Sequence, residues 1–311
     1  MSLALITGAA GFLGRHIVRE MRSAGWEILA VDSAAEENAA LPHGVVYRRM
    51  SLPDANFPGL VAEFRPAACV HCAGRASVAA SVSDPRADFA AGVVVTEAVL
   101  DALRREAKGC RTIFLSSAAV YGQPETLPVS ESAKLAPLSP YGYHKRICEI
   151  LMEQAARLGG VPAASARIFS AYGPGLRRQV LWETAMQYAG KGKAVLRGTG
   201  RETRDFIHAV DAARAIRLIV EKGACEGEVY NVATGQETTI RDAAEMLAGF
   251  FPSAKPAVFE GGKMTGDPER WVADCSRIRS LGFGTSLPLM EGLRSLADWV
   301  KAENSVGIPN V

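Results

Sequence analysis

Three polar residues in the middle of the chain could move a proton to and from a hydroxyl group. Tyr141 and Lys145 lie four residues apart in a segment expected to begin a helix, so their side chains would share one helix face. The lysine ammonium would favour the phenolate form of the tyrosine, which could then act as a general acid or base. Ser117 ends the preceding apolar run and could hydrogen-bond the reacting oxygen. On its own, the tyrosine–lysine spacing would be better explained as the start of an ordinary amphipathic helix.

A glycine triad near the N-terminus changes that interpretation. Three glycines spaced three residues apart follow the apolar run at residues 3–6 and precede an expected helix. Glycine permits a tight turn and lets the backbone approach a pyrophosphate, and the helix would point its N-terminal N–H groups at the phosphates. The spacing is G-x-x-G-x-x-G rather than G-x-G-x-x-G, but the physical requirements are shared. The sequence therefore predicts a dinucleotide site at Gly8, Gly11, Phe12, Leu13 and Gly14.

Two further segments are expected to complete the cofactor site. Asp32 ends the second apolar run, where its carboxylate could accept hydrogen bonds from the adenosine ribose and would repel a 2′-phosphate. This favours NAD over NADP, although Asp32 could instead merely cap a loop. Ala73 and Gly74 follow the fourth predicted strand, at the sheet edge where ligands bind. Arg75 could meet phosphate or simply face solvent.

Composition excludes several classes of protein. The chain has 311 residues, 48% of them hydrophobic, and a net charge of +2, which gives no reason to expect nucleic acid or an anionic membrane as a partner. The sequence shows neither a signal peptide nor an apolar run of about 20 residues, so we expect a cytoplasmic protein. Cys69 and Cys72 form a C-x-x-C within a predicted strand, where positions three apart face opposite sides. We interpret them as buried structural thiols and predict no metal site.

The pattern of apolar runs predicts an α/β fold with two lobes. Short apolar runs alternate with helical stretches over residues 1–170, which is typical of a Rossmann-type doubly wound parallel sheet that binds NAD. The strands are expected at 3–6, 27–31, 45–49, 67–72, 111–115 and 163–168, and the helices at 12–24, 55–64, 84–107 and 141–158. Residues 171–311 are expected to form a smaller α+β C-terminal substrate lobe, from which residues 203–222 could pack back on the first domain.

Several motifs in a fixed order carry a family resemblance over almost the whole chain. It resembles the extended short-chain dehydrogenase/reductases, specifically the NAD-dependent nucleotide-sugar epimerase/dehydratase family. The motifs are T-G-x-x-G-x-x-G from Thr7, S-S-A-x-V-Y-G from Ser116, S-P-Y-G-x-x-K from Ser139, Arg167 to Gly175, R-D-F-I-H from Arg204 with Asp211, Glu228 to Val232, Gly266-Asp267-Pro268, and Ala273-Asp274.

The resemblance implies a reaction through a 4-keto sugar. Tyr141 would take the proton of the sugar C4 hydroxyl, Lys145 would hold the phenolate and the nicotinamide ribose, and Ser117 would position the C4 oxygen. Arg204 matches the family arginine that reaches the nucleotide-sugar phosphates, and an arginine suits this task through its bidentate fork. The resemblance also implies a homodimer that associates through helices near 84–107 and 141–158.

Departures from the family pattern bear on the substrate. The acidic pair of the dehydratases is replaced by Ala118 and Ala119, so dehydration is not expected. Ser170 stands where an asparagine often contacts the diphosphate, and Met264 stands where an arginine is frequent, with Lys263 or Arg270 as possible substitutes. Ser51 stands in place of an adenine-contacting aspartate, and Gly92 stands in place of an asparagine near the catalytic lysine.

Three functions remain open from the sequence. The leading hypothesis is a nucleotide-sugar 4-epimerase acting on a UDP-hexose. The same Ser117, Tyr141 and Lys145 would serve a nucleotide-sugar 4-ketoreductase equally well. A non-catalytic NAD-binding protein is the alternative from a different class, and the intact set of three residues argues against it.

Overall fold

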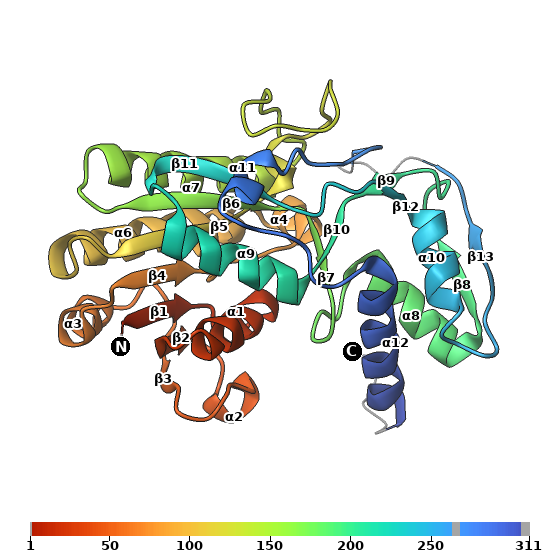
Figure 1. Ribbon diagram of the computed structural model, residues 1–311, viewed down its shortest axis with the longest axis horizontal. Coiled ribbons are helices and arrows are strands. Elements are labelled where there is room, and N and C mark those ends of the chain that lie inside the picture. The colour runs from red at the N-terminus through yellow and green to blue at the C-terminus, as the bar shows by residue number, and fades with distance from the viewer. Residues whose placement is uncertain (1, 263–267, 306–311) are drawn as a thin grey trace.

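A seven-stranded parallel sheet forms the centre of the larger lobe in the computed structural model, which describes residues 2–262 and 268–305 (Figure 1). The strand order is β11-β6-β5-β4-β1-β2-β3, and every neighbouring pair is parallel. The order reverses direction at β1 and β4, so their carboxyl ends form the switch point at which such sheets bind ligands. The predicted Rossmann-type fold is confirmed. The strands of this sheet are β1 (Leu3–Thr7), β2 (Glu27–Asp32), β3 (Val46–Arg49), β4 (Ala68–His71), β5 (Arg111–Ser117), β6 (Ala163–Ile168) and β11 (Glu226–Val232).

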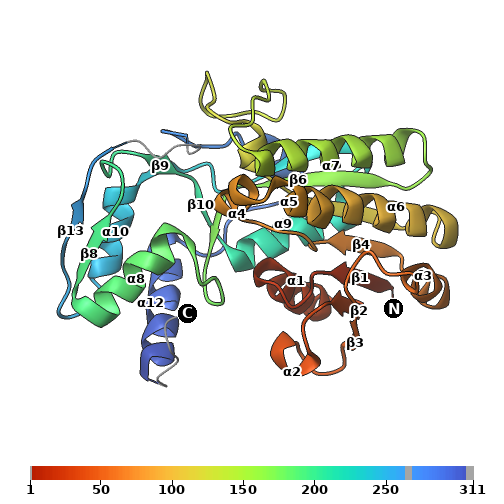
Figure 2. The same ribbon diagram turned by 180° about the vertical axis from the view of Figure 1, so that it is seen from behind.

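Helices cover both faces of the sheet, which explains why its inner strands are mostly apolar. Helices α1 (Phe12–Ser23) and α9 (Ala209–Lys222) cover one face, and α3 (Phe57–Phe64), α6 (Val95–Glu106) and α7 (Pro140–Arg157) cover the other (Figures 1 and 2). Within β1, Ala4 and Ile6 pack under the first pair of helices while Leu5 packs under the second group. Cys69 is buried in the core of one face, whereas Cys72 is partly buried and packs against the core of the other face, and both are free thiols.

The larger lobe also takes elements from the second half of the chain. Helix α9 packs against α1, and β11 pairs with β6 in the main sheet. The predicted boundary at residue 170 therefore places β11 on the wrong side. The reason is that β6 is buried on both faces and needs a partner at its open edge, a long-range requirement that the local pattern of β11 does not show.

The smaller lobe has its own apolar core. Helices α8 (Gln179–Lys191), α10 (Ile240–Ala248) and α12 (Leu289–Ser305) pack together beside the two-stranded sheet of β8 (Lys193–Leu196) and β13 (Lys255–Phe259). Figure 1 shows this lobe beside the carboxyl ends of the main strands. Short strands connect the lobes, namely β7 (Ser170–Tyr172), β9 (Thr203–Arg204), β10 (Phe206–His208) and β12 (Thr238–Thr239).

The predicted helix at 84–107 is wrong in its middle. It is divided into α5 (Pro85–Phe89), a π-helical turn η1 (Ala90–Val94) and α6. Gly92 lies in the centre of this turn, and its carbonyl oxygen accepts a hydrogen bond from Thr96 Oγ1 at 2.8 Å. A glycine followed by β-branched residues weakens the regular helix there. The other short elements are α2 (Glu36–Ala39), α4 (Val78–Ser83), the 3₁₀ turn η2 (Ala118–Val120) and α11 (Ser276–Ser280).

In the part of the chain that the structure describes, no helix combines the length and the apolar character needed to cross a bilayer. The cytoplasmic location stays a prediction from the sequence.

Two neutral histidines lie where the lobes meet. His16 on α1 has Nε2 at 3.2 Å from the carbonyl oxygen of Pro174. His208 caps α9, because its Nδ1 accepts the Val210 N–H at 3.3 Å, and its Nε2 lies 3.2 Å from Ser295 Oγ on α12. Burial lowers the pKa of His208 to about 4 and also lowers the pKa of His16. Protonation of His208 at Nδ1 would remove the cap of α9.

We expect acid to destabilise the protein through His208. Its pKa in the folded state lies below the ordinary value of 6.5, so the unfolded chain binds a proton first as the pH falls, and stability is lost between about pH 6.5 and pH 4. Between pH 7 and pH 5 the loss amounts to at most about 2 kcal/mol. Denaturant unfolding of His208→Gln at both pH values should show a smaller loss than the wild type. His43→Gln, an exposed control, should match the wild type, and an equal loss in His208→Gln would contradict the assignment.

Candidate active site

The glycine turn forms a tight backbone cradle between β1 and α1. Gly8 has φ +67°, and a Cβ there would lie 2.6 Å from the backbone nitrogen of Ala73. A Cβ on Gly14 would overlap the carbonyl oxygen of Gly8. Gly11 is the N-cap of α1 without a side-chain bond, and the first turn of α1 carries no acidic residue, so no side chain of the helix itself competes for its N-terminal N–H groups. These features fit the pyrophosphate of NAD, which Gly8, Gly11, Phe12, Leu13 and Gly14 would hold.

Asp32 ties the end of β2 to this turn. Its carboxylate accepts the N–H of Ala10 at 2.9 Å and that of Ala34 at 3.0 Å. Asp32 therefore does cap the loop, and each oxygen keeps a lone pair for a further donor. The contact with the adenosine ribose stays a prediction.

The segment after β4 closes over the glycine turn. The Ala73 N–H donates to Thr7 Oγ1 at 3.4 Å, which joins the ends of β4 and β1. Gly74 has φ +136°, a conformation that favours glycine, and a Cβ there would lie 3.4 Å from the carbonyl oxygen of Ala91 in the π-helix. Arg75 is exposed.

The structure brings Ser117, Tyr141 and Lys145 to the carboxyl end of β5. Ser117 is the last residue of this strand and caps η2, where its Oγ accepts the Ala119 N–H at 3.2 Å. Helix α7 begins at Pro140 with Ser139 as its cap, so Tyr141 and Lys145 lie on its first two turns. Lys145 Nζ donates to the Leu115 carbonyl oxygen at 2.7 Å and lies 5.7 Å from the centre of the Tyr141 ring. This arrangement places the ammonium group beside the phenol ring, and the first turn of α7 lies against the turn that Ser117 caps, since a Cβ on Gly142 would be 2.6 Å from the carbonyl oxygen of Ala119.

The predicted phosphate-binding residues have different surroundings. Arg204 is partly buried, with its guanidinium 5.6 Å from the centre of the Trp271 ring and Nη1 donating to the carbonyl oxygens of Thr203 and Pro268. Arg270 is exposed and forms a bidentate ion pair with Glu237, with both N–O distances at 2.7 Å. Arg270 would have to exchange this partner before it could bind a diphosphate. The sequence pattern gives no sign of the pair, because its members are far apart in the chain.

Two further residues that the sequence suggests for the diphosphate site are Ser170 and Lys263. The N–H of Ser170, the first residue of β7, donates to the Asp205 carbonyl oxygen at 3.1 Å. Lys263 and the neighbouring Met264 lie outside the described residues.

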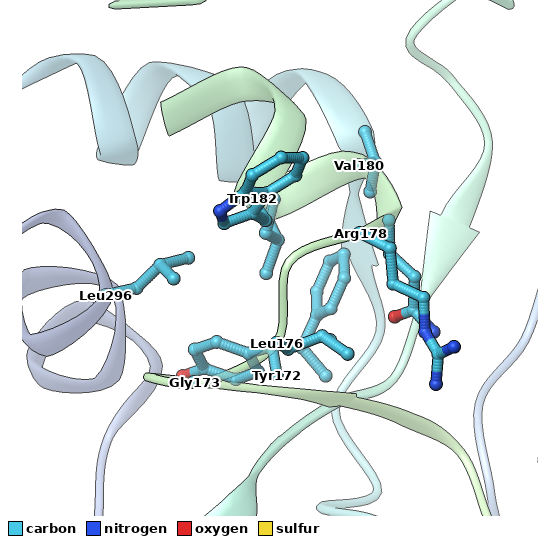
Figure 3. A pocket seen from close by; sticks show the side chains of 10 residues that line it. Tyr172, Gly173, Leu176, Arg178, Val180, Trp182 and Leu296 are labelled. Carbon is cyan, nitrogen blue, oxygen red and sulfur yellow. The ribbon is translucent and has the colours of Figure 1, made fainter. Parts of the chain in front are cut away.

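A small crevice lies in the smaller lobe. It lies between α8 and α12, where Trp182 and Leu296 point toward it and the Arg178 guanidinium points away (Figure 3). Its volume of about 10 Å³ is enough for roughly one water molecule. The crevice is therefore too small for a nucleotide sugar.

Sequence reasoning missed a buried polar chain behind the cofactor site. His71 is fully buried at the end of β4, and burial lowers its pKa to about 3, so it is neutral. Its Nδ1 lies 2.6 Å from Thr7 Oγ1 and its Nε2 lies 3.2 Å from Thr96 Oγ1. Because the Thr96 hydroxyl donates to Gly92, the geometry assigns the proton to Nε2. The one sign of this chain in the sequence is a histidine at the end of an otherwise apolar strand, since a buried histidine needs hydrogen-bond partners.

The fold and the site define a Rossmann-type enzyme of the short-chain dehydrogenase/reductase class. The chain belongs to the NAD dependent epimerase/dehydratase family, whose profile matches residues 4–233. The predicted family and the predicted cofactor, NAD, are confirmed.

Known proteins similar to this chain include both epimerases and a reductase. The UDP-glucose 4-epimerase of Thermotoga maritima, solved with UDP-glucose, is 27% identical with a TM-score of 0.89, covering 97% of this chain and 99% of that one. The UDP-glucose 4-epimerase of Thermus thermophilus, solved with NAD, is 28% identical with a TM-score of 0.85, covering 96% and 99%. The GDP-6-deoxy-D-mannose reductase of Pseudomonas aeruginosa is 27% identical, covering 94% and 96%.

We expect the protein to bind NADH more tightly than NADPH, because the Asp32 carboxylate would repel the 2′-phosphate. Asp32→Asn removes the charge and keeps the shape of the side chain, so it should narrow the difference between the two affinities. Isothermal titration with each cofactor measures this. Asp298→Asn, an exposed change on α12, is the matched control and should bind as the wild type does. Tighter binding of NADPH by the wild type would exclude this role for Asp32.

Proposed function

We propose that the protein is a nucleotide-sugar 4-epimerase that acts on a UDP-hexose through a 4-keto sugar. The observation that carries this proposal is the convergence of Ser117, Tyr141 and Lys145 beside the glycine cradle. The similarity to UDP-glucose 4-epimerases supports the choice of reaction and of nucleotide.

Each of the three side chains has a distinct task in this proposal. The Tyr141 phenolate accepts the proton of the C4 hydroxyl and later returns it, while the Lys145 ammonium stabilises the phenolate. Ser117 Oγ donates a hydrogen bond to the C4 oxygen throughout. Bound NAD supplies the oxidising power at C4 and then the reducing power. Between these two stages the 4-keto sugar turns its other face toward the cofactor.

The substrate lobe would hold the nucleotide diphosphate. Arg204 is the principal cation for this task, because Thr203, Pro268 and Trp271 already fix its orientation. Ser170 and Arg270 would assist, the latter after release from Glu237.

Two other reactions compete with epimerisation. Dehydration needs an acid and a base after the catalytic serine, and the methyl groups of Ala118 and Ala119 can supply neither. A 4-ketoreductase could use the same three residues, and the reductase of Pseudomonas aeruginosa is a relative. The intact set of Ser117, Tyr141 and Lys145 argues against a non-catalytic NAD-binding protein.

The decisive experiment incubates the purified protein with UDP-glucose, UDP-galactose and other UDP-hexoses without any added reductant. We expect C4 epimers to interconvert, as read by NMR of the anomeric protons, without a lasting change in absorbance at the NADH band. Stoichiometric consumption of NADH with a 4-keto sugar, without interconversion of epimers, would establish the reductase instead.

Tyr141→Phe should abolish most turnover, because only the proton-transferring hydroxyl is lost. The expected decrease in kcat is about 10²–10⁴-fold, with NAD affinity nearly unchanged. Tyr143→Phe is the matched control, since its exposed ring lies two residues away on the same helix, and it should keep wild-type activity. A near-native rate in Tyr141→Phe would show that another group transfers the proton.

We propose in addition that a second copy of the chain covers an exposed apolar face of the larger lobe. Val82, Phe89, Val94 and Ile150 are each at least 40% exposed and lie on α4, α5, η1 and α7. Figure 2 shows these elements side by side on one face. Light scattering at micromolar concentration should give a dimer, and Ile150→Glu should give a monomer. Leu158→Glu, at the end of α7, should remain dimeric, and a monomeric wild type would contradict this proposal.

A further inference from the structure

A buried ion pair lies directly behind the catalytic segment. Glu149 on α7 and Arg167 on β6 are each 2% exposed. Arg167 Nε donates to Glu149 Oε1 and Nη2 donates to Oε2, both at 2.9 Å, so the pair is bidentate. Such an arrangement gives geometric definition as well as attraction.

This pair holds both ends of the turn that Ser117 begins. On one side, the preceding residue, Ser116, donates from Oγ to Glu149 Oε1 at 2.7 Å. On the other side, Arg167 Nη1 donates at 2.9 Å to the hydroxyl of Tyr121, the residue that follows η2. The Tyr121 hydroxyl in turn donates to Asn231 Oδ1 on β11 at 2.6 Å. The position of Ser117 is therefore fixed from both directions by one ion pair.

The same pair also fixes the helix that carries the other two reactive groups. Glu149 lies one turn after Lys145 on α7, and Lys145 Nζ donates to the Leu115 carbonyl oxygen. Helix α7 is thus joined to consecutive residues of β5 at two levels, through Lys145 to Leu115 and through Glu149 to Ser116. A slip of one residue along α7 would move Tyr141 by about 1.5 Å. A displacement of about 1 Å can cost roughly 100-fold in rate.

Stability alone does not require such a pair. Taking two charges out of water is expensive, and replacing a buried ion pair by apolar side chains of similar size is often neutral or stabilising. The pair has in addition a hydrogen bond to each flank of the Ser117 turn, which apolar side chains could not make.

We propose that Glu149 and Arg167 are positioning residues that set Ser117 in register with Tyr141 and Lys145, a role that rests on the proposed 4-keto reaction. Ser116 and Tyr121 connect the pair to the Ser117 turn. A merely structural pair would hold the lobe together without affecting the chemical step.

The test separates the two roles with an apolar double variant. Glu149→Met combined with Arg167→Met removes both charges together, so neither charge is left buried without its partner and the variant should fold, with a moderately lower thermal midpoint because Ser116 and Tyr121 each lose a hydrogen bond. A positioning role predicts that kcat falls at least about 10-fold while KM and the NAD dissociation constant change less than about twofold. The reason is that the variant would disturb the alignment of Ser117 with Tyr141 and Lys145 and leave the binding of substrate and cofactor intact. A folded double variant whose kcat equals that of the wild type would overturn the proposal.

A single substitution tests the positioning role if the double variant does not fold. Ser116→Ala removes only the hydrogen bond to Glu149 and should lower kcat severalfold with little loss of stability. Ser165→Ala changes another buried serine, on the neighbouring strand β6, and should retain wild-type kcat. A kcat in Ser116→Ala equal to that of Ser165→Ala would then overturn the proposal.

Turnover of the wild type on UDP-hexoses is measured first, so that failure of the proposed function is recognised separately. If no nucleotide sugar turns over, crystal structures of the wild type and the folded variants with NAD read out positioning directly. A Ser117 turn and a Lys145–Leu115 bond that stay in place without the ion pair would overturn the proposal, and their displacement would support it.

Discussion

The hydrogen bond from Lys145 Nζ to the Leu115 carbonyl oxygen is the constraint on which the rest of the site depends. It joins the helix that carries Tyr141 to the strand that ends in Ser117, at a distance of 2.7 Å. Parallel strands bring their carboxyl ends to one edge, so a helix that starts above that edge presents its first turns to a bound ligand. The site is thus produced by one helix–strand junction rather than by mobile loops, and this suits a reaction that depends on alignment.

The part of the site that would bind the cofactor depends on the close approach of the ends of β1 and β4. The backbone at Ala73, just after β4, lies so close to Gly8, just after β1, that position 8 has no room for a Cβ. Behind them, Thr7, His71 and Thr96 form a buried chain of hydrogen bonds that reaches Gly92 in the π-helix. A neutral histidine can donate at one nitrogen and accept at the other, which is what this chain requires. The glycine turn and the irregular helix are therefore held by the same side chains.

Much of this architecture was predictable because its signals are local. Most of the six strands before residue 170 are apolar runs, β3 being the exception, and Ser139, Pro140 and the Tyr141–Lys145 spacing mark the start of α7. The features that were missed depend on contacts between distant residues. The pairing of β11 with β6, the ion pair of Arg270 with Glu237 and the network around Glu149 all form only after the chain has folded.

The central claim is that Ser117, Tyr141 and Lys145 support oxidation and reduction at C4 within a single binding event. UDP-glucose carrying deuterium at C4 tests this most directly when it is incubated in ordinary water without added reductant. The account predicts that the UDP-galactose formed keeps its deuterium at C4, as read by NMR and mass spectrometry. UDP-galactose that has lost the deuterium, or a label that accumulates in the cofactor while no epimer forms, would contradict it.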